Sequence, residues 1–529
     1  MRTVIFGVDG LTYRILHPMI ERGELPNFKK VSEQGCEAIL SSKYPPLTPP
    51  AWISLSTGLK PAGHGVYDFW SYEEQFQRGV ARKSHVQTHR KGAKAIWNIL
   101  SEYGKQVVVI NIPSTYPPEP VNGVMVSGYM TPSTNVDFTY PASFKEELAR
   151  VVPDYEIDLD TYTYERMKVS GKVGPLVDAT LRMTEKRIKL LLHLLKERAW
   201  DFCYIAFIGS DRLQHPIWEE IIANDPQAIE YYRLLDKALG EVLDQLGPDD
   251  ALFIVSDHGF QGHSTYFDIN EYLYSKGLLV MGPGFEAQRS KASRANNLRR
   301  LASQVGLRSV ARKIKRSLKT ANLWTQPASD EGLDRPVLDD VDWERTLAYV
   351  PSFSGFQGGY ADIFLSPDIS AQQQAELIAD LKKQIHPKTG KPFIDAIYTT
   401  EVFGNGPYAP TEPHLLLLPT DGVTFRVSLG NERLWDDLGK AFGSHQKDGV
   451  LYAYGGGIKK GFKAPTAEIY DLVPTVLRSM QLPLPHEFDG RILEELFEEG
   501  KESEPAQKAA ENGTESGLAR RKLKKLLEA

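Results

Sequence analysis

The sequence predicts an α/β fold, in which a central, mostly parallel sheet is flanked by helices on both faces. One reason is that short apolar runs, typical of buried strands, alternate with longer stretches of helical periodicity. The other is that polar residues follow three of these runs: Asp9 after Thr3–Val8, Ser210-Asp211 after Phe202–Ile208, and Ser256-Asp257-His258 after Ala251–Val255. Open α/β sheets bind ligands at the carboxyl ends of their strands, so these residues indicate one built site at a sheet edge.

The individual elements follow from the same two patterns. Apolar runs predict strands at Thr3–Val8, Cys36–Leu40, Val107–Ile112, Gly123–Val126, Phe202–Ile208, Ala251–Val255, Leu347–Val350, Ala361–Phe364, Leu415–Leu418 and Val450–Tyr454. Helical spacing predicts helices at Tyr13–Arg22, Pro26–Glu33, Ala95–Tyr103, Leu176–Arg198 and Ile229–Leu246. The region Val151–Gly174 is irregular, and no element is assigned to it.

The composition is ordinary for a soluble globular protein, with 41% hydrophobic and 25% charged residues in a chain of 529. A net charge of −6 excludes a strongly basic polyanion binder overall, and we expect no specific recognition of nucleic acid. The two cysteines, Cys36 and Cys203, argue against a disulfide framework and fit a reducing compartment. Neither a signal-peptide pattern nor an apolar run of the roughly 18 residues that span a bilayer is present. We therefore expect a cytoplasmic protein.

Thr48 lies between two proline pairs in the segment Tyr44–Trp70. Because proline disfavours the α region for the residue before it, we expect Thr48 to be extended, at or just before the start of a helix. A helix N-terminus carries partial positive charge and suits a phosphate group. Thr48 could simply cap this helix. Alternatively, its hydroxyl could act as a nucleophile, provided that other parts of the chain supply metal ligands.

The α/β pattern is interrupted by a basic segment. Residues 289–319 carry many lysines and arginines, no acidic residue occurs between Arg289 and Ser329, and apolar residues recur at helical spacing. We therefore expect a catalytic core in two parts, residues 1–285 and 346–497, with an inserted helical cap at 286–345 and a flexible charged tail at 498–529. The basic segment is either a solvated face packed on the core or a surface for an anionic membrane or a polyanion.

The chain contains the side chains needed for a metal site. Asp211 and His215 are four residues apart just after a strand, so a helix there would place both on one face. The sequence Asp257-His258-Gly259 suits a tight, metal-gripping turn, and His445 stands on what we expect to be a loop of small residues. Together with Asp9, this gives three carboxylates and three imidazoles, a donor set that suits Zn²⁺ or Mn²⁺.

In this order and spacing, these motifs resemble the type I phosphodiesterase/nucleotide pyrophosphatase family of the alkaline phosphatase superfamily. The motifs are Asp9-Gly10, Thr48 with Thr57-Gly58 and His64-Gly65, Asp211/His215, Asp257-His258-Gly259 and His445. The segments TPPAWISLSTG, GHGVYDF and HQKDGVLYAYG are similar to those of the cytosolic prokaryotic branch of the family, which consists of predicted phosphohydrolases or phosphomutases. The resemblance covers roughly residues 1–280 and 345–490, and it implies an alkaline-phosphatase-like fold.

The resemblance also implies two divalent metal ions, zinc or manganese, about 4 Å apart. Asp211, His215 and His445 would hold one ion, and Asp9, Asp257, His258 and the Thr48 oxygen would hold the other. A phosphodiester, phosphoanhydride or phosphomonoester of a small molecule would then be cleaved through a phospho-threonine intermediate.

Two residues depart from the nucleotide pyrophosphatase pattern. The position three residues after the nucleophile, an asparagine that binds a phosphate oxygen in those enzymes, is Ala51 here, and Pro49 has no N–H to donate. Lys43 or the inserted cap would have to supply that contact, and Trp52 is a further candidate substrate contact. The aromatic residues Tyr67–Trp70 line a pocket or pack in the core, and His64 and His263 are expected to be structural.

Other functions would use the same site. A phosphomutase or a phospho-group transferase needs the same metals, and the basic segment could provide an arginine-rich lid. A sulfatase is disfavoured because the oxidisable cysteine is absent and Trp52 replaces the expected arginine. A non-catalytic binding protein is disfavoured because all six metal-binding side chains and the hydroxyl are present together.

Overall fold

The computed structural model describes residues 1–42, 46–72, 83–86, 90–160, 164, 173–282, 285, 341–351, 359–409, 414–427, 429 and 433–499. Lys43, the basic segment 289–319, most of the expected cap and nearly all of the tail lie outside these residues. In the part of the chain that is described, no helix is both long enough and apolar enough to cross a membrane.

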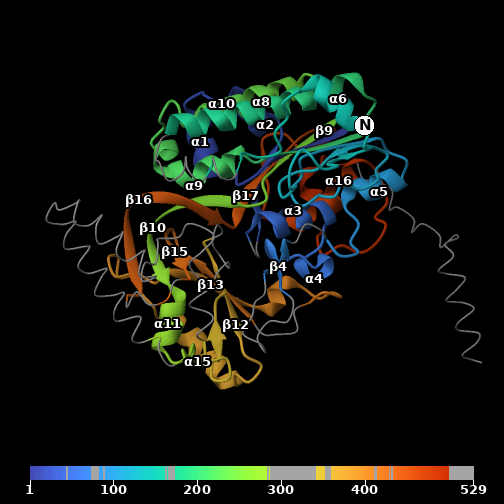
Figure 1. Ribbon diagram of the computed structural model, residues 1–529. Helices are drawn as coiled ribbons and strands as arrows, with labels where there is room; N and C mark the ends of the chain where they lie inside the picture. The colour runs from blue at the N-terminus through green and yellow to red at the C-terminus, as the bar shows by residue number, and fades with distance from the viewer. Residues whose placement is uncertain are drawn as a thin grey trace, which may run out of the picture.

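A large central sheet organises the upper part of the molecule (Figure 1). Its strand order is β18 (Phe462–Lys463), β2 (Cys36–Ser41), β17 (Asp448–Gly455), β9 (Ala251–Val255), β1 (Thr3–Val8), β8 (Phe202–Phe207), β5 (Val107–Ile110), β6 (Gly123–Val126) and β7 (Thr139–Tyr140), with β19 (Ala467–Glu468) also paired to β2. The strands from β9 to β6 are mutually parallel, whereas β17 and β7 run antiparallel to their neighbours. The predicted mostly parallel sheet is confirmed.

Helices cover both faces of this sheet, as the alternation of strand side chains requires. In β1, Val4, Phe6 and Val8 belong to one buried cluster and Ile5 to the other. The first cluster packs against α1 (Tyr13–Glu21), α2 (Pro26–Gln34), α6 (Phe144–Val151), α8 (Val173–Glu197), α9 (Gly209–Ile222) and α10 (Glu230–Leu243). The second packs against α3 (Thr48–Thr57), α5 (Ile96–Glu102) and α16 (Leu472–Ser479). The short helix α4 (Pro61–His64) follows α3.

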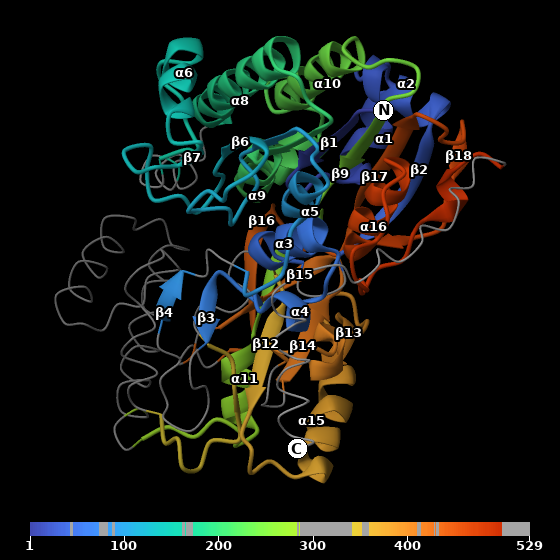
Figure 2. The ribbon, with the colours of Figure 1, turned by 90° about the vertical axis from the view of Figure 1, so that its right-hand side faces the viewer.

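A second group of sheets lies below the central one and has its own apolar core (Figure 2). One sheet contains β15 (Gly422–Arg426), β10 (Gly259–Asp268) and β16 (Trp435–Gln446), and the other contains β11 (Ala348–Tyr349), β12 (Ala361–Leu365), β14 (His414–Pro419) and β13 (Ile394–Thr399). Helices α11 (Ile269–Ser275) and α15 (Ala371–Lys382) pack with them. A strand pair, β3 (Trp70–Tyr72) and β4 (Lys83–Val86), and the 3₁₀ helices Thr400–Phe403, Ile469–Asp471 and Glu494–Leu496 complete the described elements.

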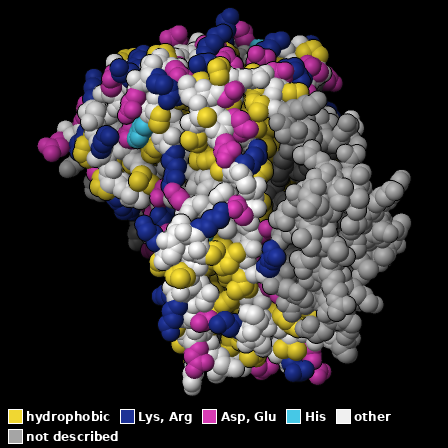
Figure 3. All heavy atoms as spheres, turned by 90° about the vertical axis from the view of Figure 1, so that its left-hand side faces the viewer, with side chains coloured by type: hydrophobic (Ala, Val, Ile, Leu, Met, Phe, Trp, Pro, Cys, Tyr) yellow, Lys and Arg dark blue, Asp and Glu magenta, His cyan; other side chains and the backbone are white. Residues whose placement is uncertain are grey.

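On the face of the molecule that Figure 3 shows, acidic and basic side chains of the described residues are interspersed. This mixture agrees with the small net charge of −6.

The backbone at Thr48 differs from our expectation. The extended residue is Leu47, with φ −134° and ψ 134°, and Thr48 is the first residue of α3. Prolines at the first helical positions cost no hydrogen bond, because those N–H groups would have no partner within the helix. The Ala51 N–H then closes the first turn on the Leu47 carbonyl at 3.0 Å. The helix has no side-chain N-cap, so Thr48 does not serve as one.

The surroundings of His445 also differ from our expectation. We predicted a small-residue loop, but Gly443-Ser444-His445 is part of strand β16, where His445 is the register partner of Phe260 in β10. The prediction was wrong because the glycine is needed for close packing, not for a turn. A Cβ on Gly443 would lie 2.2 Å from the Gln214 carbonyl oxygen, so β16 can approach α9 only at a glycine.

This contact generates a prediction about stability. We expect Gly443→Ala to lower the free energy of unfolding by about 3 kcal/mol, because the backbone of β16 or α9 must move to admit the methyl group. Urea denaturation followed by circular dichroism would measure the change. The matched control is Gly247→Ala, whose new Cβ would meet only the Asp250 carboxylate at 3.5 Å, and we expect a change within about 0.5 kcal/mol. Equal effects of the two substitutions would contradict the close packing at Gly443.

Candidate active site

Three buried carboxylates lie at the carboxyl ends of three adjacent strands. Asp9 follows β1, Asp257 follows β9, and Asp211 is in the first turn of α9, directly after β8. Each of the three side chains is at most 3% exposed. Because β9, β1 and β8 are parallel neighbours, their ends coincide and bring the three carboxylates into one space, as the sequence predicted.

Asp211, His215 and His445 form the first of two groups of candidate metal ligands, called the ligand groups below. The Nε2 atom of His215 lies 3.2 Å from Asp211 Oδ1, and that of His445 lies 3.1 Å from the same oxygen. The two Nε2 atoms are 3.2 Å apart. Asp211 and His215 share one face of α9, and His445 reaches them from β16, more than 200 residues away in sequence.

Asp9, Asp257 and His258 form the second group. The Nε2 atom of His258 lies 3.2 Å from Asp257 Oδ2 and 3.5 Å from Asp9 Oδ1. The register of β10 and β16 stacks the His258 ring on that of His445, with ring centres 3.7 Å apart. His258 therefore lies within 4.8 Å of ligand atoms of both groups, and the two groups adjoin.

Thr48 lies beside the second group. Its hydroxyl oxygen is 3.5 Å from His258 Nε2, and its residue is 4% exposed. Thr48 is the first residue of α3, and its own N–H is the only one in the first three helical positions, because Pro49 and Pro50 have none. The hydroxyl, the imidazole and the carboxylates of Asp9 and Asp257 thus converge.

Backbone carbonyl groups orient the three imidazoles. The Nδ1 atoms of His215, His258 and His445 lie 3.1, 3.1 and 2.8 Å from the carbonyl oxygens of Gly443, Gly259 and Pro46, respectively. A carbonyl oxygen can only accept, so each Nδ1 carries the proton and donates it. The Nε2 atom of each ring then keeps its lone pair for a ligand, an arrangement typical of metal-binding histidines.

Two carboxylates keep one oxygen without a hydrogen-bond partner. Asp9 Oδ2 accepts from Trp52 Nε1 at 2.9 Å, and Asp257 Oδ1 accepts from the Gly10 N–H at 3.1 Å. Within the described residues, the buried atoms Asp9 Oδ1 and Asp257 Oδ2 accept no hydrogen bond. Buried carboxylate oxygens beside an imidazole lone pair fit a divalent cation, so the residues present suit the metal chemistry that the sequence implied.

The electrostatics of the site lead to the same conclusion. Burial raises the pKa of Asp9 well above its ordinary value, and the charge of Asp211 raises it further. Burial likewise raises the pKa of Asp257, with Asp9 as the next cause. Burial lowers the pKa of His258, and His445 lowers it further, so the ring is neutral. These carboxylates can be ionised together only beside additional positive charge.

Arg212 partly provides that charge, and the sequence analysis overlooked it. Its Nη1 donates to Asp211 Oδ2 at 2.8 Å, and its other nitrogens donate to Asp158 at 3.1 and 2.8 Å. Burial alone would raise the pKa of Asp211, but His215, His445 and Arg212 outweigh it and hold that pKa well below its ordinary value. Arg212 thus holds one oxygen of Asp211 and leaves the other for the imidazoles. Its place next to Asp211 in the DRLQH motif was the available signal.

The other residues that the sequence singled out do not belong to the two ligand groups. Trp52 is fully buried and donates to Asp9, so it orients a candidate ligand and is not positioned to line a substrate pocket. His64 is buried against Ser54, and burial lowers its pKa to about 3, which fits the expected structural role. Tyr67 donates to the Tyr408 carbonyl at 2.6 Å, and Phe69 packs on Tyr129. Lys43 lies outside the described residues.

Comparisons with known proteins agree with this site. The family model of type I phosphodiesterase/nucleotide pyrophosphatase matches residues 3–334, more than half of the chain. No significant match was found among curated proteins.

Two solved structures share the fold. Phosphonoacetate hydrolase from Sinorhizobium meliloti 1021, in complex with phosphonoformate, has a TM-score of 0.53 and 16% identity over 89% of this chain and 94% of that one. Inactive murine ectonucleotide pyrophosphatase/phosphodiesterase 5, in complex with AMP, has a TM-score of 0.50 and 10% identity over 94% of this chain and 100% of that one. The family match, supported by this shared architecture, establishes that the chain belongs to the type I phosphodiesterase/nucleotide pyrophosphatase family of the alkaline phosphatase superfamily and is a phosphoester hydrolase.

Proposed function

We propose that this hydrolase binds two divalent metal ions and cleaves a small-molecule phosphoester through a covalent phospho-Thr48 intermediate. The observation that carries the proposal is the position of the Thr48 hydroxyl, 3.5 Å from His258 Nε2 at the junction of the two ligand groups. A hydroxyl that only stabilised the helix would be expected to cap it, and α3 has no side-chain cap.

The proposed ligands divide into two sets. Asp211, His215 and His445 would hold one ion, and Asp9, Asp257, His258 and the Thr48 oxygen would hold the other. Mixed carboxylate and imidazole donors favour zinc, with manganese as the alternative. When bound, the two ions would lower the pKa of the Thr48 hydroxyl and neutralise charge on the phosphoryl group.

The residues of the chain would then act as follows. The Thr48 oxygen attacks phosphorus, and the bond from phosphorus to the leaving alcohol oxygen breaks. Water subsequently cleaves the phospho-threonine and restores the free hydroxyl. The helix N-terminus of α3 favours the negative charge of the phosphoryl group throughout. Trp52, Gly10 and Arg212 keep the carboxylates in place by occupying the oxygens that do not face His258 or the other imidazoles.

Replacing the nucleophile tests this proposal directly. We expect Thr48→Ala to reduce hydrolysis of bis-p-nitrophenyl phosphate or p-nitrophenyl phosphate, in the presence of Zn²⁺ or Mn²⁺, by at least about 10³-fold. Thr48→Ser, which keeps a hydroxyl, should retain measurable turnover. The matched control is Thr57→Ala in the same helix, where the lost hydroxyl donates to the Ile53 carbonyl and accepts from the Leu59 N–H, away from the ligand groups. Full activity of Thr48→Ala would refute the nucleophile assignment.

The metal count gives a second test. We expect the purified chain to hold two zinc ions and Asp257→Asn to hold about one, because the group of Asp211, His215 and His445 stays intact. Metal analysis by mass spectrometry after dialysis would measure both values. Asp236→Asn is the control, since this buried carboxylate bonds N–H groups of α2 away from the site. If Asp257→Asn retained two ions, the second ligand set would be wrong.

A further inference from the structure

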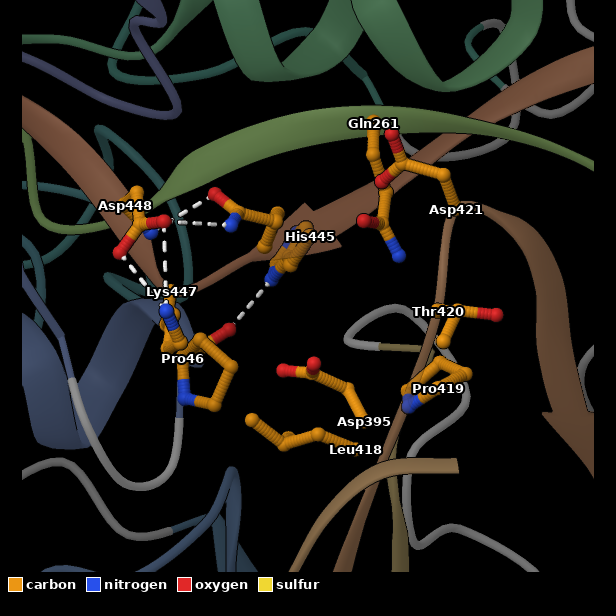
Figure 4. Close-up of a pocket in the computed structure, with 11 residues that line it drawn as sticks. Pro46, Gln261, Asp395, Leu418, Pro419, Thr420, Asp421, His445, Lys447 and Asp448 are labelled. Atoms are coloured by element: carbon orange, nitrogen blue, oxygen red, sulfur yellow. Dashed lines mark hydrogen bonds and ion pairs between the residues drawn. The ribbon is translucent and has the colours of Figure 1, made fainter. Parts of the chain in front are cut away.

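A pocket of about 310 Å³ opens beside the first ligand group (Figure 4). Strands of the lower sheets form most of its wall, and residues 445–448, which lead from β16 into β17, close it. Its lining residues are Pro46, Gln261, Asp395, Leu418, Pro419, Thr420, Asp421, His445, Gln446, Lys447 and Asp448. The volume is at the lower end of the range for ligand pockets, which suits a small group.

The pocket is continuous with the proposed catalytic site. His445 belongs to both, and its Nδ1 donates to the carbonyl oxygen of Pro46, another lining residue, at 2.8 Å. Pro46 is also two residues before Thr48. A phosphoester whose phosphorus lies near Thr48 could therefore extend its substituent into this space.

Most charged groups of the pocket are already paired. Lys447 Nζ lies 3.1 and 3.3 Å from the two carboxylate oxygens of Asp448, and Asp421 accepts from Arg14 at 2.6 and 3.1 Å. Within the described residues, Asp395 has no ion-pair or hydrogen-bond partner for its side chain, and Figure 4 shows its carboxylate pointing into the pocket. The pocket thus carries one uncompensated negative charge, which disfavours a substituent that contains a second phosphate.

Gln261 provides evidence for a ligand site that does not depend on the acidic residues. It is 3% exposed, its side-chain amide has no hydrogen-bond partner among the described residues, and Figure 4 shows that amide directed from β10 into the pocket. Because the amide faces the pocket and the fold gives it no partner, its hydrogen-bonding capacity is available to a ligand. An amide can both donate to and accept from a hydroxyl group.

The other lining groups complete a surface for hydroxyl groups. Thr420 adds a hydroxyl, and the Asp395 carboxylate can accept two hydrogen bonds. His445 is the one aromatic ring among the described lining residues, and one of its faces is stacked on His258. The pocket therefore offers no pair of aromatic faces between which a nucleobase could stack and no aromatic cage for a quaternary ammonium group.

We propose that this pocket binds the hydroxyl-rich part of the substrate, so that the enzyme acts on the phosphoester of a small polyol or single sugar ring. This inference rests on the proposed function, because it assumes that the phosphoryl group binds beside Thr48. Gln261 and Asp395 are its specificity-determining residues, and they would contact hydroxyl groups remote from phosphorus.

Binding to a chain that cannot turn over would test the proposal. The probes are myo-inositol 1-phosphate and cyclohexyl phosphate, which share a six-membered carbon ring and differ in their hydroxyl groups. Isothermal titration calorimetry of the zinc-loaded Thr48→Ala chain should show at least about tenfold tighter binding of the inositol ester. Adding Gln261→Ala or Asp395→Asn should reduce this preference several-fold, and Asp395→Asn changes an exposed side chain that the fold does not require.

Glu401→Gln is the matched control, because it removes an exposed carboxylate just after β13, outside the pocket. It should leave the preference for the inositol ester unchanged. Equal binding of the two esters, or tighter binding of choline phosphate or AMP, would overturn the proposal. Failure of the proposed function has a different signature, since the chain with Thr48 intact would then leave p-nitrophenyl esters uncleaved whichever ester binds more tightly.

Discussion

The structure depends on one electrostatic constraint, the burial of three carboxylates in a single space. Asp9, Asp211 and Asp257 are each almost fully enclosed, yet among the described residues Arg212 is the one lysine or arginine that contacts any of them. Burial and mutual repulsion raise the pKa values of Asp9 and Asp257, so these groups resist ionisation until positive charge is supplied. A protein gains nothing in stability from such a cluster, and this cost is most readily explained by the binding of cations.

The fold meets this constraint with rigid elements. The parallel register of β9, β1 and β8 places the carboxylates, and the antiparallel pairing of β10 with β16 places two histidines against them. The chain leaves the central sheet after His258, builds the lower sheets, and returns at His445. The antiparallel pair of β10 and β16 holds the two ends of this segment together. His258 and His445 therefore stack although nearly 190 residues separate them.

Sequence reasoning could predict the parts of the site that depend on local pattern. Buried strands followed by Asp9, Asp211 and Asp257 identified the sheet edge, because parallel strands end together. It could not predict that His445 lies on a strand, since the pairing partner is β10, far away in the chain. It also passed over α15, although Ser370 and Gln373 form a capping box there, and over Arg212, whose role depends on Asp158 and Tyr129 from distant segments.

The proposed metal ligands and the proposed substrate-selecting residues lie in different parts of the fold. The proposed metal ligands come mainly from the ends of the central sheet, whereas Gln261 and Asp395 come from strands of the lower sheets. The two regions meet at His445, which faces the carboxylates through Nε2 and the pocket wall through Nδ1 and Pro46. Among the lower strands, β10 and β16 also contact the ligand groups, through Phe260 and the Gly259 and Gly443 carbonyl groups. Strand β13, which carries Asp395, supplies no proposed ligand, so its side chains can vary without disturbing those groups. Under the proposed function, such a division would let one catalytic site serve different phosphoesters, with the substrate set by residues that do not contact phosphorus.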